Sequence, residues 1–179
     1  MTGSTSGPVF IVDVNIRTIE RTDLATLLEM LQEFAEFEDL LPNFEVTQER
    51  LSRAMFGEDG PLEGLIAFVE EKSAGYALFF PNFSSFRGQC GFYLDDLYIR
   101  SQYRGMGLGE RMLKEIARIA HTRGYERIDF VVLDWNTPAI GFYEKLGYEL
   151  FGTLEGYPPE SRQYFFAKRL TPSLPEGTI

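Results

Sequence analysis

Apolar positions in the first third of the chain change from an alternating spacing to a helical one. Residues 9–19 are rich in β-branched side chains and alternate in part between apolar and polar, which predicts a first strand. A helix follows over residues 23–39, because leucines recur there every three or four positions and Asp23 offers an N-cap. Pro42 interrupts this pattern, and residues 47–57 predict a short second helix. A helix with one apolar face requires a sheet against which it can pack.

The remaining pattern predicts strands first, and then strands that alternate with helices. Three β-like runs cover residues 65–70, 74–80 and 91–99, and the polar residues 71–73 join the first two as a hairpin. A long amphipathic helix follows Gly109 and stops at Gly124. Beyond it we expect a strand at 127–133, a helix that Asn136 caps and that runs to Leu146, and closing strands at 148–154 and 163–168. This order predicts an α/β (α+β) fold with a mixed, mostly antiparallel central sheet and helices on both faces.

One compact domain accounts for most of the chain. Its 179 residues, of which 44% are apolar, are enough to bury a single core. We expect this domain to span residues 9–170, because residues 1–8 are small and polar and residues 171–179 are rich in Pro and Gly, as is typical of flexible tails. No run approaches the roughly 18 to 20 apolar residues that span a bilayer, and residues 1–8 lack the basic and apolar regions of a signal peptide. These features predict a soluble, cytoplasmic protein without a membrane partner.

The formal net charge of −10 narrows the expected partners. It disfavours nucleic acid, because a phosphate backbone attracts patches of Lys and Arg rather than an excess of carboxylates. A cationic ligand is compatible with this charge, and so is an acidic surface that serves only solubility. The single cysteine, Cys90, and the single histidine, His121, form neither a disulfide nor a cluster of metal ligands, so we expect no metal and a reducing compartment.

The glycine-rich segment at residues 104–109 is the strongest chemical signal in the sequence. It lies between the strand predicted at 91–99 and a helix, and its three glycines alternate with other residues. Such a segment is compatible with an ordinary turn, but it also lets backbone N–H groups at a helix start approach a pyrophosphate without Cβ obstruction. Arg104 either adds charge toward the phosphates or pairs with a surface carboxylate. A Walker A loop is disfavoured because Glu110 and Arg111 stand where it needs Lys and Ser or Thr, and a dinucleotide fold would place its glycines after an early strand.

Two segments resemble the GNAT superfamily of N-acetyltransferases. The segment RGMGLG at residues 104–109 resembles that family's Arg/Gln-x-x-Gly-x-Gly/Ala loop, which binds acyl-CoA. Residues 134–148, with Asn136 and the Phe142-Tyr143 pair, are similar to the family's Asn-x-x-Ala-x-x-Phe-Tyr-x-Lys-x-Gly-Phe/Tyr segment at the expected distance downstream. The resemblance covers roughly residues 14–170. It implies a GNAT-like sheet in which two strands splay apart at the acyl-CoA site.

A narrower resemblance is to the diamine acetyltransferases, the branch that acetylates spermidine, spermine and thialysine. It rests on the segment YLDDLYI at 93–99, on WNTP at 135–138, and on Phe37 and Glu38 after the first helix. It implies acetyl-CoA-dependent transfer to the primary amine of a small cationic acceptor (a diamine, a polyamine or a lysine-like side chain) by direct attack in a ternary complex, and it implies a homodimer. The alternatives are acetylation of a protein N-terminus or lysine, and a non-catalytic acyl-CoA-binding module.

The resemblance assigns the chemistry to a phenol and a carboxylate. An alkylammonium has a pKa of roughly 10.4, so it must lose a proton before it attacks, and the thiolate of CoA must gain one. Tyr143 occupies the place of the general acid beside the sulfur of CoA; the alternative is an ordinary core aromatic beside Ile140. Asp95 stands where the branch has a glutamate as general base. Because Asp is one methylene shorter, it acts either through a water molecule or only as a charge that holds the ammonium.

The resemblance also implies which residues bind the two substrates. For acetyl-CoA they are Leu97, Tyr98, Ile99, Arg104, Gly105, Met106, Gly107, Leu108, Gly109, Asn136 and Tyr143. For the amine they are Phe37, where the branch often has Tyr, and Glu38, Asp95, Asp96 and Tyr157. Asp96 shares a cleft with Asp95 only if a β-bulge interrupts the strand, because neighbouring side chains of a regular strand point to opposite faces. A solvated helix end and a polar strand edge are the alternatives for Glu38 and for the aspartate pair.

Overall fold

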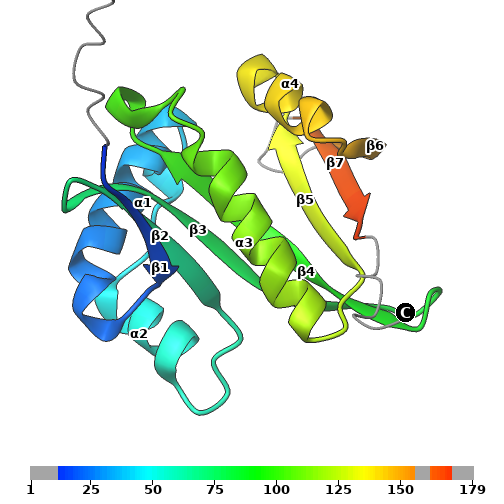
Figure 1. The fold of residues 1–179 in the computed structure, drawn as a ribbon, viewed down its shortest axis with the longest axis horizontal. Coiled ribbons are helices and arrows are strands. Elements are labelled where there is room, and N and C mark those ends of the chain that lie inside the picture. The colour runs from blue at the N-terminus through cyan, green and yellow to red at the C-terminus, as the bar shows by residue number, and fades with distance from the viewer. Residues whose placement is uncertain (1–11, 156–161, 171–179) are drawn as a thin grey trace, which may run out of the picture.

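The computed structural model describes residues 12–155 and 162–170, which form a seven-stranded sheet with helices on both faces (Figure 1). The sheet has the order β1-β2-β3-β4-β5-β7-β6. The strands are β1 (Val14–Thr18), β2 (Glu63–Val69), β3 (Lys72–Ser84), β4 (Gln89–Ile99), β5 (Arg127–Leu133), β6 (Glu149–Glu155) and β7 (Arg162–Arg169). The α-helices are α1 (Leu24–Phe37), α2 (Gln48–Phe56), α3 (Leu108–Thr122) and α4 (Thr137–Lys145), and the short 3₁₀ helices are η1 (Arg21–Asp23), η2 (Leu41–Asn43) and η3 (Ser101–Tyr103).

Every neighbouring pair of strands is antiparallel except β4 and β5, which run parallel. This confirms the predicted mixed, mostly antiparallel sheet. The β2–β3 hairpin turns at Glu70 and Glu71, whose φ angles are 48° and 66°. Two-residue hairpin turns favour such left-handed backbone because it matches the twist of the strands. The sequence pattern places this turn at residues 71–73, and the structure corrects that position.

The β3–β4 hairpin is longer than the apolar pattern indicates. Its ladder reaches Ser84 opposite Gln89, whereas the pattern predicts strands at 74–80 and 91–99. Pro81 and the polar residues after it break the apolar alternation, so the end of the ladder is not visible in the sequence. The hairpin projects beyond the body of the molecule (Figure 1).

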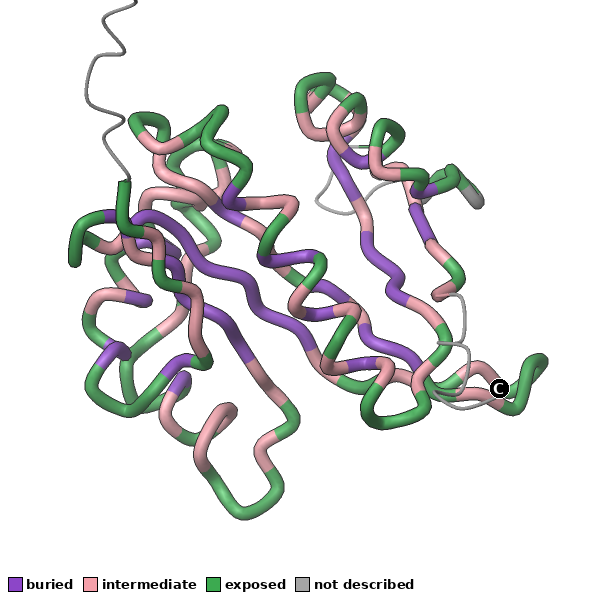
Figure 2. Tube along the Cα trace, in the orientation of Figure 1, coloured by how far each residue is buried: buried purple, intermediate pink, exposed green. Residues whose placement is uncertain are grey.

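The two faces of the sheet carry different helices (Figure 1). Helices α1 and α2 cover one face, over a core that includes Leu27, Met30, Leu51, Ile66 and Tyr76. Helices α3 and α4 cover the other face, over a core that includes Phe79, Met112, Ile116, Phe130 and Tyr143. Figure 2 shows that buried residues follow the central strands, which explains why these strands are apolar on both faces. Within the described residues, no helix combines the length and the apolar character needed to cross a membrane.

The cap predicted for α4 is confirmed, and the one predicted for α1 is not a side-chain cap. Asn136 Oδ1 accepts a hydrogen bond from the Ala139 N–H at 3.3 Å, which is the N-cap contact. Asp23 stands at the N-cap of α1, but its carboxylate accepts from the Glu20 N–H at 2.8 Å and from Arg17 at 2.6 and 2.9 Å. It therefore stabilises the turn that leads into α1.

Candidate active site

Strands β4 and β5 separate along their length. Among the described residues, their ladder consists of Phe92 opposite Ile128 and Tyr93 opposite Asp129. Beyond this point β5 leaves β4 and pairs along its whole length with β7 (Figure 1). Within residues 12–155 and 162–170, the edge of β4 after Tyr93 consequently has no strand partner on this side. This confirms the predicted splayed pair of strands.

A cavity of about 600 Å³ lies at this splay. Most residues predicted to bind acetyl-CoA are in its wall, namely Leu97, Tyr98, Ile99, Arg104, Gly105, Gly107, Leu108, Gly109, Asn136 and Tyr143. Met106 is outside this wall, and its side chain is exposed. Phe37 lines the cavity, and so does Phe34, which the sequence analysis missed. The signal for Phe34 was its helical spacing from Phe37, which places both rings on one side of α1.

The glycines of the loop before α3 have two different structural purposes. Gly105 and Gly107 have φ angles of 78° and 76°, and a Cβ at either would meet open space. Glycine is favoured at both positions because it adopts the left-handed backbone without steric cost. The space beside each glycine is open to a ligand. A Cβ at Gly109 would lie 3.1 Å from the ring of Phe142, so this glycine lets α3 approach α4. The first N–H groups of α3 consequently border the cavity from a loop with room for an anion.

Three side chains from different elements contact one another at the cavity residues Phe37 and Arg104. Arg104 donates from Nε to the Ile99 carbonyl oxygen at 2.9 Å, and its guanidinium lies 5.2 Å from the centre of the Phe37 ring. The Phe37 ring also contacts Trp135, with 5.8 Å between the two ring centres. Phe37 and Trp135 are both more than two-fifths exposed. In the sequence, Trp135 is only part of the segment WNTP at 135–138, and the structure places its ring against Phe37.

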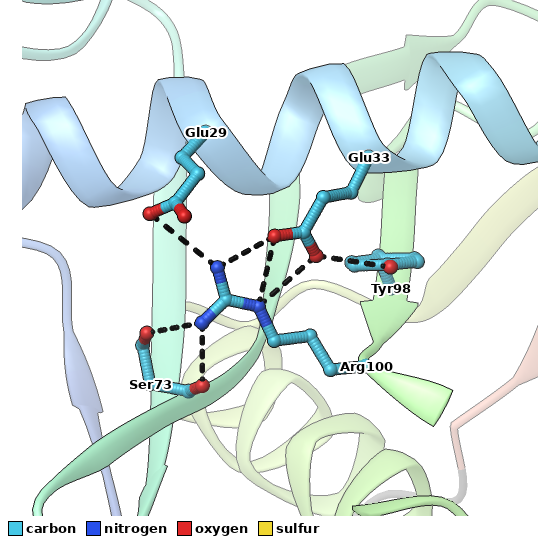
Figure 3. Close-up of polar contacts among 5 residues, drawn as sticks. All are labelled: Glu29, Glu33, Ser73, Tyr98 and Arg100. Carbon is cyan, nitrogen blue, oxygen red and sulfur yellow. Dashed lines mark hydrogen bonds and ion pairs between the residues drawn. The ribbon is translucent and has the colours of Figure 1, made fainter. Parts of the chain in front are cut away.

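Arg100, which follows β4, ties the strand that bears the site to α1 (Figure 3). Its guanidinium donates to the carboxylate of Glu33 at 2.7 to 3.1 Å, lies 3.4 Å from Glu29, and donates to the carbonyl and hydroxyl oxygens of Ser73 at 3.0 and 2.7 Å. Glu33 also accepts from the Tyr98 hydroxyl at 3.1 Å. Because Tyr98 lines the cavity, this network fixes α1 against the site. Sequence reasoning missed it because 67 residues separate Arg100 from Glu33.

A bulge in β4 turns Asp96 toward α1. Consecutive residues of β3 pair with Leu94 and Asp96, so Asp95 is the extra residue. The extra residue reverses the alternation: Leu94 packs in the core under α3, whereas Tyr98 packs in the core under α1. The Tyr76 hydroxyl accordingly donates to Asp96 Oδ2 at 3.3 Å from the α1 side. The bulge that a shared cleft for Asp95 and Asp96 requires is therefore present.

Three predicted amine-binding carboxyls, Glu38, Asp95 and Asp96, are not in the cavity wall itself, but Glu38 and Asp96 directly follow or precede the wall residues Phe37 and Leu97, and the charges of Glu38 and Asp95 act on Asp96. Burial raises the pKa of Glu38, which follows α1, to about 7. Burial also raises the pKa of Asp96 to about 7, with further contributions from the charges of Asp95 and Glu38, while the hydrogen bond from Tyr76 opposes the rise. Asp95 is exposed at the edge of this group, yet the protein around it still raises the pKa of its carboxyl. A cation bound near these carboxyls would favour their ionised forms.

Tyr143 is a core aromatic residue that also forms part of the cavity wall, and its role as general acid stays a prediction. Its side chain is 7% exposed and packs on Phe130, with 4.1 Å between ring centres, and on Tyr148. It also lines the cavity. Burial, followed by Tyr148, Asp96 and Glu38, raises the pKa of its phenol. The phenol is therefore protonated at neutral pH and lies within the electrostatic reach of the carboxyl groups. Tyr157, the last of the residues predicted to bind the amine, lies outside the described residues.

Comparison with known proteins agrees with this architecture. Residues 24–148 match the Acetyltransferase (GNAT) family. The thialysine N-epsilon-acetyltransferase of Caenorhabditis elegans is 36% identical over 142 residues, which cover 79% of this chain and 87% of that protein. The spermidine/spermine N(1)-acetyltransferase-like protein 1 of Homo sapiens is 31% identical over 149 residues, which cover 79% of this chain and 21% of that protein.

Solved structures show the same fold. Arabidopsis thaliana NAA60, in complex with a bisubstrate analogue and with acetyl-CoA, matches with TM-scores of 0.73 and 0.70 at 16% identity. The matches cover 90% and 88% of this chain and 100% and 99% of those chains. On its sequence match and its relatives, the chain belongs to the acetyltransferase (GNAT) family and is an acetyltransferase.

Proposed function

We propose that this enzyme transfers the acetyl group of acetyl-CoA to the primary amine of a small cationic acceptor, such as a diamine, a polyamine or a lysine-like side chain. The observation that carries this proposal is the group of carboxyls formed by Glu38, Asp95 and Asp96, of which Glu38 and Asp96 lie within the electrostatic reach of the cavity-lining Tyr143. A bound ammonium stabilises the ionised carboxylates against their mutual repulsion and against the cost of burying their charge, whereas a neutral acceptor does not. The thialysine and spermidine/spermine names of the relatives agree with a cationic amine.

The cavity fits acetyl-CoA by its backbone donors and by the space beside them. The N–H groups at the start of α3, with the open glycines 105 and 107, would hold the pyrophosphate. The edge of β4 over residues 97–99, which pairs with no other described strand on the β5 side, would offer backbone groups to the pantetheine arm. Arg104 would add positive charge at the cavity wall. When bound, acetyl-CoA supplies the thioester carbon to which the amine adds.

The chain's own residues would carry the proton transfers. An alkylammonium with a pKa of roughly 10.4 must lose a proton before it attacks directly, and the aspartates 95 and 96 take up both the ammonium and this proton. Tyr143 gives its phenolic proton to the departing sulfur. Its raised pKa keeps that proton in place at neutral pH. General acid–base help of this kind contributes about 10²- to 10⁴-fold to the rate.

A panel of amines with detection of the released thiol tests the proposal. Diamines, polyamines, lysine and thialysine should react with a kcat/KM about tenfold or more above that of a peptide with a free N-terminus. The proposal fails if acetyl-CoA binds, no amine speeds thiol release, and Tyr143→Phe leaves the residual turnover unaltered. A preference for the peptide would instead support the protein-acetylation alternative. Binding without turnover would support an acyl-CoA-binding module.

A further inference from the structure

We propose that Asp96 is the group that takes the acceptor's proton, that Tyr76 positions its carboxylate, and that Asp95 binds the ammonium as a fixed charge. This inference rests on the proposed function and divides the work of the two aspartates. The family resemblance instead places the base at Asp95.

The bulge gives the two aspartates different surroundings. Asp96 is half-buried and shares the α1 side of the sheet with Tyr98, whereas Asp95 is the unpaired residue of the bulge and is exposed. Within the described parts of the chain, no hydrogen bond fixes the carboxylate of Asp95. A general base needs a defined position toward the proton that it removes, while a charge that attracts an ammonium tolerates freedom.

Tyr76 supplies that position for Asp96. Its ring is completely buried in the core under α1, against Tyr98 with 5.9 Å between ring centres, and its hydroxyl donates to Asp96 Oδ2 at 3.3 Å. The pKa of this phenol is raised well above its usual value, chiefly by burial, so the hydroxyl is a donor throughout the working pH range. One carboxylate oxygen is thereby held next to the cavity residues Leu97 and Tyr98.

The titratable groups around Asp96 come from each element packed against it. They are Asp95 and Tyr93 on β4, Tyr76 on β3, Glu38 after α1, and Tyr143 on α4. Because the nearby carboxyls and burial all favour the protonated form, Asp96 has a proton affinity matched to neutral pH. A cation bound at Asp95 and Glu38 lowers that affinity, so the proton leaves Asp96 more readily once an acceptor is present.

The proton balance closes without a further reactant. The acceptor's ammonium gives one proton to Asp96, and its electron pair forms the bond to the thioester carbon. As the carbon–sulfur bond breaks, Tyr143 gives its proton to the sulfur and regains the second proton of the nitrogen. The proton on Asp96 then passes to solvent, so each cycle yields an amide, a thiol and one proton.

The pH dependence of kcat/KM tests the roles of Asp96 and Tyr76. We expect the rate of the wild-type enzyme to fall as the pH drops through about 7, the pKa of Asp96. Tyr76→Phe removes a hydrogen bond to the charged form, so this acidic limb should move up by about half to one pH unit. If the acidic limb of the Tyr76→Phe variant stays at the pH of the wild type, Tyr76 does not position Asp96. Titration of the ¹³C-labelled aspartate carboxyls by NMR reports the same shift without any acceptor.

Replacing each aspartate by asparagine distinguishes the residue that removes the proton from the residue that only binds the ammonium. Asp96→Asn should lower kcat by about 10²-fold or more, and this deficit should shrink for an acceptor whose α-amine has a pKa of roughly 8, because less help is needed to deprotonate it. Asp95→Asn should mainly raise the KM of the amine. The exposed Asp59→Asn is the matched control. The opposite pattern, with the kcat loss and its dependence on amine pKa at Asp95, overturns the inference but leaves the proposed function intact; an enzyme that acetylates no amine ends both.

Discussion

Replacing Arg100 by Met should release α1 from the sheet while it preserves most of the side-chain volume. The Arg100 side chain is 15% exposed and that of Glu33 is 32% exposed, so their pair lies between a buried and a surface ion pair. Breaking a buried pair costs about 3–5 kcal/mol and a surface pair is worth about 0–1 kcal/mol, which gives about 2–3 kcal/mol for Arg100→Met. For a domain of this size the melting temperature should fall by about 4–12 °C.

Thermal unfolding followed by circular dichroism measures this loss. Arg118→Met is the matched control, because Arg118 pairs with Glu115 on the surface of α3 with a side chain that is 63% exposed, and it should cost at most about 0.5 kcal/mol. Since Tyr98, which lines the cavity proposed for acetyl-CoA, shares Glu33 with Arg100, the Arg100 variant should also raise the KM of acetyl-CoA. If both variants melt within about 2 °C of each other, the network does not hold α1 and the reasoning is refuted.

The pH dependence of this loss has a definite sign. The hydrogen bonds from Arg100 are the largest cause of a lowered pKa at Glu33. A carboxyl whose folded pKa lies below its unfolded value stabilises the protein above the unfolded value, and this stabilisation disappears as the pH falls through the folded pKa. The difference in stability between the wild type and Arg100→Met should therefore be largest near neutral pH and shrink below about pH 4.5.

Four further predictions concern the site and the assembly. Tyr143→Phe should reduce kcat by about 10²- to 10⁴-fold with little change in the Kd of acetyl-CoA, which calorimetry measures. Gly107→Ala, at a φ of 76°, should cost about 1–2 kcal/mol and weaken acetyl-CoA binding, whereas Gly141→Ala within α4 should be neutral or stabilising in the same melts. Glu38→Gln should raise the KM of a polyamine more than that of a monoamine and flatten its salt dependence, and equal effects on both would contradict the charge argument. The expected homodimer stays a prediction that light scattering after gel filtration tests.

The sequence alone determined the elements and the position of the glycine-rich loop before α3. Helical and alternating spacings depend on near neighbours, so α1, α3 and the central strands follow from local patterns. The same holds for the glycines at 105 and 107, because a left-handed backbone before a helix restricts the residue type. The Asn136 cap is equally local, since its acceptor and donor are three residues apart.

Only the tertiary structure decided how the site's side chains meet. The register of β3 against β4 places the bulge at Asp95 and so turns Asp96 to Tyr76, which lies 20 residues earlier in the chain. The contact between Arg100 and Glu33 spans 67 residues, and the contact of the Phe37 ring with the Trp135 ring joins α1 to the loop before α4. A one-residue shift of register exchanges the two faces of a strand without changing its apolar content. The side of the sheet on which the Asp96 carboxyl lies is therefore set by how β3 and β4 pair.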